Sequence, residues 1–349
     1  MPMILSRIPA ELRNRLFGMY GFLMAGNVLV WVWAIAMFHD QPLLMGSALL
    51  AYSFGLRHAF DADHIAAIDN VTRKMMQDGK RPVGIGLFFS LGHSTVVVLL
   101  TLAIALGAAL AETQFDALKE IGGVVGTSIS AVFLFLIAGA NAIILVGVWK
   151  SFNRVKNGGT YDEADLDILL ANRGLLARVF RGLFRHISKS WHMYPLGFLF
   201  GLGFDTATEV GLIGLSTTQA ANGMSAWSVL VFPALFAAGM TLIDTTDSVM
   251  MLGAYGWAFV KPIRKLYYNL TITLVSVLVA VVVGGIEAAG LLVDQLDLHG
   301  GIWDFISMTN DHFGTLGYAI VGLFALSWLV STIIYRVKRY DEIDVQARA

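Results

Sequence analysis

The sequence predicts an all-α, polytopic membrane protein with eight transmembrane helices. Of its 349 residues, 56% are hydrophobic and only 14% are charged, whereas soluble domains contain about 45–50% apolar and about 25% charged residues. Eight apolar segments are each long enough to cross a bilayer, which takes about 20 residues in a helix. Helices are expected because hydrocarbon offers the backbone no water to bind, so each segment must satisfy its own polar groups.

The expected spans follow one another along the whole chain, and polar or charged residues separate them. Only one connection, between spans 4 and 5, is both long and hydrophilic. The spans are predicted at residues 17–38, 42–68, 84–109, 121–148, 194–218, 226–258, 267–292 and 314–335.

That connection divides the chain into two membrane halves. Residues 1–148 hold spans 1–4, and residues 194–349 hold spans 5–8 and a C-terminal tail. Between them, residues 149–193 contain the basic stretch ILLANRGLLARVFRGLFRHISKSW, a pattern that favours an amphipathic helix lying on the membrane surface. The N-terminal stretch MPMILSRIPAELRNRL lacks an apolar core with a cleavage site, so no removable signal peptide is expected.

Basic residues orient the expected bundle. All of the 24 lysines and arginines except Arg57 and Lys119 lie in the two terminal segments or in the connections that follow spans 2, 4 and 6. Lysine and arginine concentrate in cytoplasmic loops. We therefore expect a multi-pass protein of the cytoplasmic (inner) membrane, with both termini in the cytoplasm.

Span 2 ends in a stretch rich in ionisable residues, RHAFDADHIAAIDN at 57–70. A continuous helix turns about 100° per residue, which places His58, Asp61 and His64 on one face and points Asp63 away from it. Imidazole and carboxylate groups that converge inside a membrane suit a divalent transition-metal ion. The alternative is a buried ion-pair network in which Arg57 neutralises Asp61.

Three further spans carry polar groups that could complete such a site. Span 3 contributes His93, which offers a third imidazole. Spans 5 and 6 each carry two carboxylates on one face, which repel in a low dielectric unless a cation or a shared proton joins them. A metal site and a proton relay therefore remain alternatives for these pairs, which are Asp205 with Glu209 and Asp244 with Asp247.

The two halves of the chain are weakly similar to each other. FGLRHAFDADH at 54–64 is similar to FGLGFDTATE at 200–209, and FSLGHSTVV at 89–97 corresponds to FAAGMTLID at 236–244. The copies are three spans apart, so the second must cross the bilayer in the opposite direction. Inverted repeats of this kind build many secondary transporters, with the substrate site where the repeats meet. Chance similarity between glycine- and phenylalanine-rich spans is the alternative.

Enzyme signatures are absent from the sequence. It has no HExxH zinc motif, no phosphate-binding glycine loop and no GxSxG nucleophile turn, so neither ATP nor another cofactor is expected. One enzymatic alternative is an intramembrane zinc hydrolase built on His58, His64 and His93. The expected partners are a divalent metal ion and the lipid bilayer, without nucleic acid.

Four motifs together resemble the signatures of the nickel/cobalt transporter family (NiCoT). They are RHAFDADHI, LGHSTVVV, LGFDTATE and GMTLIDTTD, in spans 2, 3, 5 and 6. The resemblance implies high-affinity uptake of Ni²⁺, Co²⁺ or both, and a ligand core of His58, Asp63 and His64. Helical spacing favours Asp61 instead, and a break in span 2 would reconcile the two. Export, proton coupling, or specificity for Zn²⁺ or Mn²⁺ are the alternatives, since one ligand set binds several metals.

One more carboxylate lies within span 7. Glu287, in VVVGGIEAAGLL, is close to the expected outer end of that span. It is expected to be an interfacial residue, and a role as a gate is the alternative.

Overall fold

The computed structural model describes residues 10–107, 111–156, 188–202, 206–258 and 262–338, and all regular elements in these ranges are helical. In chain order the elements are α2 (Ala10–Phe38), α3 (Pro42–His58), α4 (Ala62–Gln77), α5 (Ile85–Gly107), α6 (Ala111–Lys156), the 3₁₀ turn η1 (Ser190–His192), α9 (Met193–Phe200), α10 (Ala207–Ala221), α11 (Ala226–Val229), α12 (Val231–Ala258), α13 (Pro262–Leu296), α14 (Ile302–Asp311) and α15 (Phe313–Val337).

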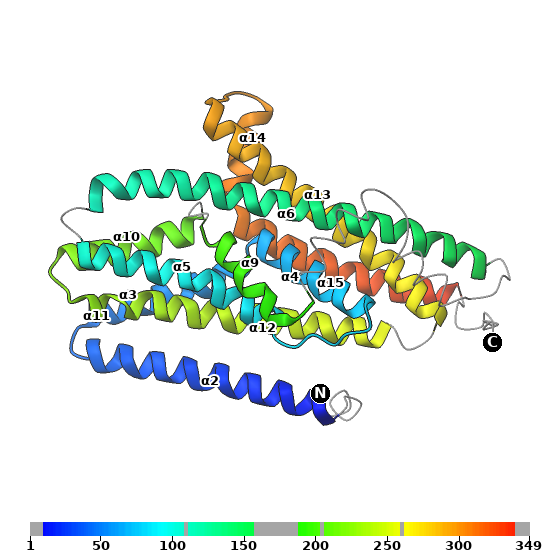
Figure 1. The fold of residues 1–349 in the computed structure, drawn as a ribbon, viewed down its shortest axis with the longest axis horizontal. Coiled ribbons are helices and arrows are strands. Elements are labelled where there is room, and N and C mark those ends of the chain that lie inside the picture. The colour runs from blue at the N-terminus through cyan, green and yellow to red at the C-terminus, as the bar shows by residue number, and fades with distance from the viewer. Residues whose placement is uncertain (1–9, 108–110, 157–187, 203–205, 259–261, 339–349) are drawn as a thin grey trace.

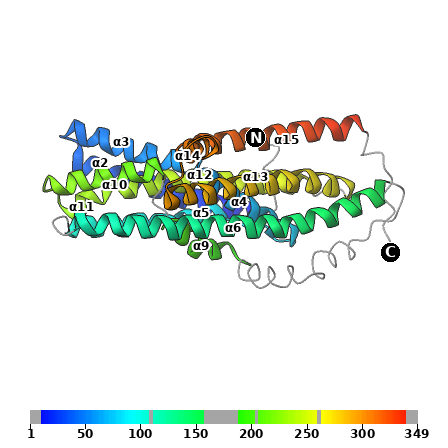
Figure 2. The same cartoon turned by 90° about the horizontal axis from the view of Figure 1, so that it is seen from above.

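Most helices run along the long axis of one bundle (Figures 1 and 2). Within the described residues, six segments are long and apolar enough to cross a membrane, and they match predicted spans 1, 3, 4, 6, 7 and 8. This confirms an all-α, polytopic membrane protein. The segments are Glu11–Phe38, Ile85–Leu106, Gly123–Lys156, Ala226–Ala254, Leu266–Leu296 and Thr315–Val337.

Predicted spans 2 and 5 are not continuous helices. Span 2 is divided into α3 and α4 by residues 59–61, and span 5 is divided into α9 and α10 by residues 201–206. Asp61 has an extended backbone at the start of α4, and Thr206 has one at the start of α10. The prediction of eight continuous spans is therefore not confirmed, and both interruptions fall within the motifs that carry the histidines and acids.

The two broken helices pack in related ways. α3 begins and α10 ends at the same end of the bundle (Figure 1), so these segments run in opposite directions. A side chain at Gly55 of α3 would overlap the backbone of Phe236 in α12, and one at Gly197 of α9 would overlap the backbone of Phe89 in α5. Phe89 and Phe236 occupy equivalent positions in the two sequence copies, which supports an inverted repeat.

The contacts also correct the alignment of the repeat. The sequences alone align Gly55 with Gly201, but the packing makes Gly197 the equivalent of Gly55. The difference is one helical turn. The difference agrees with the helix bounds, since α3 ends at His58 and α4 begins at Ala62, whereas α9 ends at Phe200 and α10 begins at Ala207.

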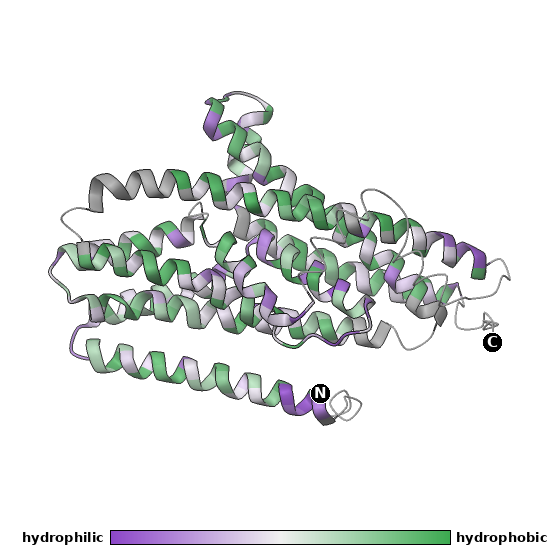
Figure 3. Cartoon of the chain, viewed as in Figure 1, coloured by the Kyte–Doolittle hydropathy of each residue, from purple (hydrophilic) through white to green (hydrophobic). Residues whose placement is uncertain are grey.

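Apolar side chains cover the outside of the bundle, and polar groups gather inside it. Figure 3 shows hydrophilic residues at the start of α2, at the end of α6 and near the middle of the bundle, around α4 and α9. Large apolar side chains such as Phe22 on α2 and Leu326 on α15 are exposed, as expected of surfaces that face lipid. Helix α14 and the turn that joins it to α13 project sideways from the bundle (Figure 1).

Arg73 corrects the expected limits of the second connection. The sequence places it in a basic cytoplasmic loop at 69–83, whereas α4 continues to Gln77 and Arg73 is fully buried. Its guanidinium donates hydrogen bonds to Thr273 Oγ1 on α13, at 3.1 Å, and to Asn70 Oδ1, at 2.8 Å. The amphipathic helix expected within 149–193 falls largely on residues 157–187, which lie outside the described residues.

Candidate metal site

Three imidazoles meet at the interruption of span 2. His58 ends α3, His64 lies in the first turns of α4, and His93 is in the middle of α5. All three are at most 2% exposed, and one ring nitrogen from each lies within 4.8 Å of the others. The break at residues 59–61 makes this possible, because it lets both histidines of RHAFDADHI turn toward α5.

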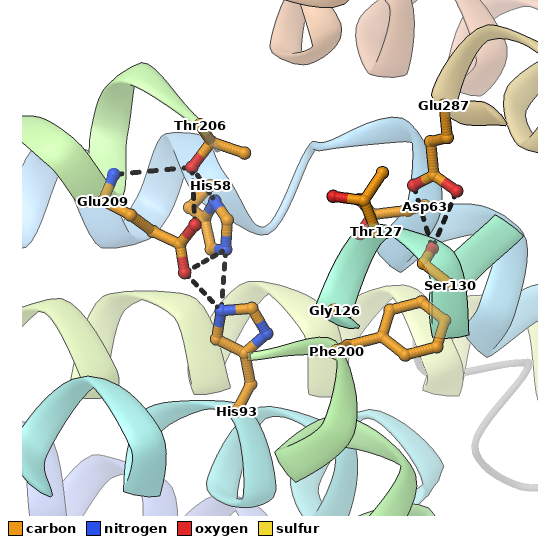
Figure 4. Close-up of a pocket in the computed structure, with 10 residues that line it drawn as sticks. All are labelled: His58, Asp63, His93, Gly126, Thr127, Ser130, Phe200, Thr206, Glu209 and Glu287. Atoms are coloured by element: carbon orange, nitrogen blue, oxygen red, sulfur yellow. Dashed lines mark hydrogen bonds and ion pairs between the residues drawn. The ribbon is translucent and has the colours of Figure 1, made fainter. Parts of the chain in front are cut away.

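Glu209 of α10 completes one side of this cluster. Its Oε1 lies 2.8 Å from His93 Nε2 and 3.8 Å from His58 Nε2, and the two Nε2 atoms are 3.1 Å apart (Figure 4). Neighbouring ligands at right angles around a metal at about 2.1 Å are roughly 3 Å apart. The three atoms are thus spaced as the ligands of one transition-metal ion.

Asp61 contacts the far side of the His58 ring. Its Oδ2 lies 2.6 Å from His58 Nδ1, and Thr208 Oγ1 lies 3.2 Å from the same nitrogen. The hydrogen bonds described for His58 Nδ1 are with threonine hydroxyls, whereas Asp61 Oδ2 is close to this nitrogen without a hydrogen bond among the described residues. A carboxylate beside a ligating imidazole supports it electrostatically while its Nε2 faces the other two groups. Arg57 is exposed, and although its charge acts on Asp61, the ion pair described for Asp61 is with His58.

Asp244 of α12 has the same relationship to His64. Its Oδ2 lies 3.1 Å from His64 Nδ1 and accepts a hydrogen bond of 2.6 Å from Ser90 Oγ on α5. The Nε2 atom of His64 is buried and has no hydrogen-bond partner among the described residues. Both histidines of span 2 therefore have a carboxylate behind one ring nitrogen.

The start of α10 holds the carboxylate of Glu209 in place. Thr206 caps this helix, and its Oγ1 donates to Glu209 Oε2 at 2.9 Å while accepting from the Glu209 backbone at 3.4 Å. The N-terminal end of a helix carries a partial positive charge that favours nearby anions. Since Asp63 occupies the first turn of α4, both helix interruptions stabilise a carboxylate in the interior.

Asp63 faces the inside of the bundle. It lines a small pocket together with His58, His93 and Glu209 (Figure 4). Asp63 lies at the end of this pocket that also holds Ser130 and Glu287, whereas Asp61 contacts the His58 ring. The role of each carboxylate as a ligand stays a prediction.

Two of the expected ligands are not placed with the imidazoles. Asp205 lies outside the described residues. Asp247 is one turn beyond Asp244 on α12, and the charges that act on it most strongly are those of Asp69 and Asp244. No described contact joins Asp247 to a histidine.

Other residues of the site were not expected from the sequence. Ser90 contacts Asp244, and Thr206 and Thr208 contact His58 or Glu209. Their signal was proximity to the four motifs, since Thr206 and Thr208 lie within LGFDTATE. Glu287 is only 4% exposed and lines the same pocket, which contradicts the expectation of an interfacial side chain.

Comparisons with known proteins agree with the resemblance seen in the four motifs. The chain is 56% identical to the "High-affinity nickel transport protein" of Cupriavidus necator, over 96% of this chain and 95% of the relative. It is 54% identical to the "Hydrogenase nickel incorporation protein HupN" of Bradyrhizobium diazoefficiens, over 91% of this chain and 83% of the relative. The "Cobalt transport protein NhlF" of Rhodococcus rhodochrous is 44% identical, over 84% of each chain.

No solved structure matches the chain. The model of one family, described as "High-affinity nickel-transport protein", matches residues 44–334, which include all four motifs and every described residue of the imidazole site. The chain belongs to this family of high-affinity nickel-transport proteins.

Proposed function

We propose that this protein is a secondary transporter that imports Ni²⁺ through the imidazole site. The observation that carries the proposal is the convergence of His58, His93 and Glu209 at ligand-to-ligand distances of 2.8–3.8 Å inside an apolar bundle. Buried ionisable groups in a membrane are costly and mark ion pathways. The relatives' names, which are those of nickel transport proteins, support the same cargo.

We assign different roles to the expected ligands according to their described contacts. In our proposal Ni²⁺ binds to one nitrogen each of His58, His64 and His93 and to a carboxylate oxygen of Glu209. Asp61 and Asp244 act through the imidazoles that they orient, and such outer partners contribute to metal affinity nearly as much as the ligands themselves. Asp247 has no part in this binding site in our proposal, and Asp205, which lies outside the described residues, stays a predicted ligand.

The membrane potential is sufficient to drive import in this proposal. It contributes about 2.3 kcal/mol per charge for each 100 mV, and therefore about 4.6 kcal/mol for a divalent cation that enters the cell. Import without ATP follows if the protein lies in the cytoplasmic membrane with both termini inside. The distribution of basic residues supports this orientation.

Co²⁺ is a second candidate cargo. One relative is named a cobalt transport protein, and imidazole and carboxylate ligands bind both metals, with Ni²⁺ the tighter of the two in the usual order of affinity. A zinc hydrolase is disfavoured, because the family and the relatives are named for transport and not for an enzymatic activity.

Uptake of radioactive Ni²⁺ tests the proposal directly. Cells that lack other nickel transporters should accumulate the metal when they produce the wild-type protein and should lose uptake with His93→Ala at equal expression. His39→Ala is the matched control, since His39 is exposed and pairs with Asp40 outside the site. Competition by Co²⁺, Zn²⁺ and Mn²⁺ then ranks the cargoes. Normal uptake by the His93 variant would refute the site.

A further inference from the structure

The pocket beside the imidazoles has two chemically different ends. His58, His93 and Glu209 lie at one end, and Asp63, Thr127, Ser130 and Glu287 line the other (Figure 4). The first end offers nitrogen and oxygen donors, whereas the second offers oxygen donors alone. Both sets line one pocket.

Glu287 is fixed firmly at the oxygen-lined end. Its carboxylate is 4% exposed, and Ser130 Oγ of α6 lies 2.8 Å from Oε1 and 2.9 Å from Oε2. Helices α6 and α13 approach closely one turn away, where a side chain at Gly284 would touch Leu134 at 3.2 Å. Close helix packing, and not side-chain flexibility, therefore holds this carboxylate inside the bundle.

The two nitrogens of His93 face in different directions. Its Nε2 faces His58 and Glu209, while its Nδ1 lies on the side of the ring turned toward Gly126 and Phe200 in Figure 4. This Nδ1 atom is buried, and it has no hydrogen-bond partner among the described residues. A buried polar atom without a partner is costly, and an ion or its bound water in the pocket would provide one.

We propose that Asp63 and Glu287, with the hydroxyls of Thr127 and Ser130, form a second cation station from which a partly hydrated divalent ion exchanges with the imidazole site. Carboxylate and hydroxyl oxygens suit cations that keep part of their water. A transport path must bind its ion tightly enough for entry and weakly enough for release, and several sites in series achieve this. In this proposal the oxygen-lined station binds the ion more weakly than the imidazole site does.

This inference rests on the proposed function, and Mn²⁺ separates the two sites experimentally. Mn²⁺ prefers oxygen ligands and binds nitrogen donors more weakly than Ni²⁺, so it cannot displace Ni²⁺ from the imidazoles. Purified full-length protein is first saturated with Ni²⁺, which tests the imidazole site by itself. Mn²⁺ is then titrated into the loaded protein, and the loss of the free-ion signal in electron paramagnetic resonance measures binding.

We expect the Ni²⁺-loaded wild-type protein to bind one Mn²⁺. Glu287→Gln should weaken that binding by about tenfold or more, and leave the Ni²⁺ affinity within about twofold. Glu11→Gln is the matched control, because Glu11 is exposed in the first turn of α2. Ser130→Ala keeps the carboxylates of the station and removes one neutral hydroxyl, so its effect on Mn²⁺ binding should be smaller than that of Glu287→Gln.

Two outcomes would overturn the oxygen station while leaving the proposed function intact: Ni²⁺-loaded wild-type protein that binds no Mn²⁺, or Mn²⁺ affinity unchanged in Glu287→Gln. If Glu287→Gln does not fold, Asp63→Asn tests the same station from α4. Unchanged Mn²⁺ binding in the Asp63 variant would also overturn the oxygen station. Wild-type protein that fails to bind Ni²⁺ in the first step would instead refute the imidazole site.

Discussion

The Nδ1 atom of His58 lies 2.6 Å from Oδ2 of Asp61, across the short interruption that separates α3 from α4. The contact joins the last residue of one helix to the cap position of the next. It therefore couples the shape of the broken span to the direction in which the His58 ring presents its other nitrogen.

The first prediction concerns this contact. Asp61→Asn should weaken Ni²⁺ binding by about 10–100-fold, the usual effect of losing an outer-shell partner of a ligating histidine. Calorimetric titration of the purified protein with Ni²⁺ measures the change. Asp40→Asn makes the same substitution at an exposed position and should have no effect. Equal affinities in the Asp61 variant and the wild type would show that Asp61 does not orient His58.

The second prediction is the composition of the metal's coordination shell. X-ray absorption at the nickel edge should show three imidazole ligands in the wild-type protein, because one nitrogen from each histidine lies within 4.8 Å of the others. His64→Ala should remove one of them, whereas Ser90→Ala should keep all three, since the described hydrogen bonds of Ser90 are to the carboxylate behind His64 and to the Gly86 carbonyl. A spectrum with oxygen ligands alone would contradict the assignment.

The third prediction tests the close approach of α3 to α12. Gly55→Ala places a methyl group against the backbone of Phe236, whereas Gly46→Ala in the same helix meets no atom within 4 Å. Overpacking of this kind costs about 1–3 kcal/mol or more, so the Gly55 variant should unfold at a clearly lower temperature. Fluorescence-detected thermal unfolding compares the two variants. Equal unfolding midpoints of the two variants would show that α3 and α12 can move apart to accommodate the added methyl group.

The fourth prediction concerns the buried Arg73. Arg73→Ala leaves Asn70 and Thr273 without their described hydrogen bonds to the guanidinium, and each hydrogen bond to a charged group contributes about 1.5–3 kcal/mol. We expect a lower unfolding temperature and less folded protein in the membrane. Arg81→Ala provides the control, as Arg81 is exposed at the end of the same connection. If the two variants are equally stable, Arg73 is not part of the core.

The fifth prediction tests the orientation of the bundle. The chain contains no cysteine, so single cysteines report their own position. Asn222→Cys, between α10 and α11, should react with a membrane-impermeant maleimide in intact cells, and Lys80→Cys, between α4 and α5, should react only after the membrane is opened. Both positions are exposed. Reversed labelling would invert the orientation, and with it the direction of transport that we infer.

Several features of this protein follow from the sequence without a structure. Its hydropathy determined the membrane class and the positions of six long helices, because a span is recognised from the length of an apolar run alone. The residue types of the site were also evident, since histidine and aspartate inside apolar segments are costly and demand a function. Similarity between the halves indicated that the interrupted segments correspond.

Only the tertiary structure decided how these residues are used. Spacing on an ideal helix placed Asp63 away from His58, yet the break at 59–61 turns Asp63 into the pocket and leaves Asp61 behind the ring. A helical wheel assumes one continuous helix, and no pattern within span 2 specifies the residue at which the first helix ends. Glu287 illustrates the same limit across a longer distance. Its burial against Ser130 depends on the packing of α6 and α13, two helices that meet through side chains more than 150 residues apart in the sequence. The local sequence alone therefore predicted an interfacial residue.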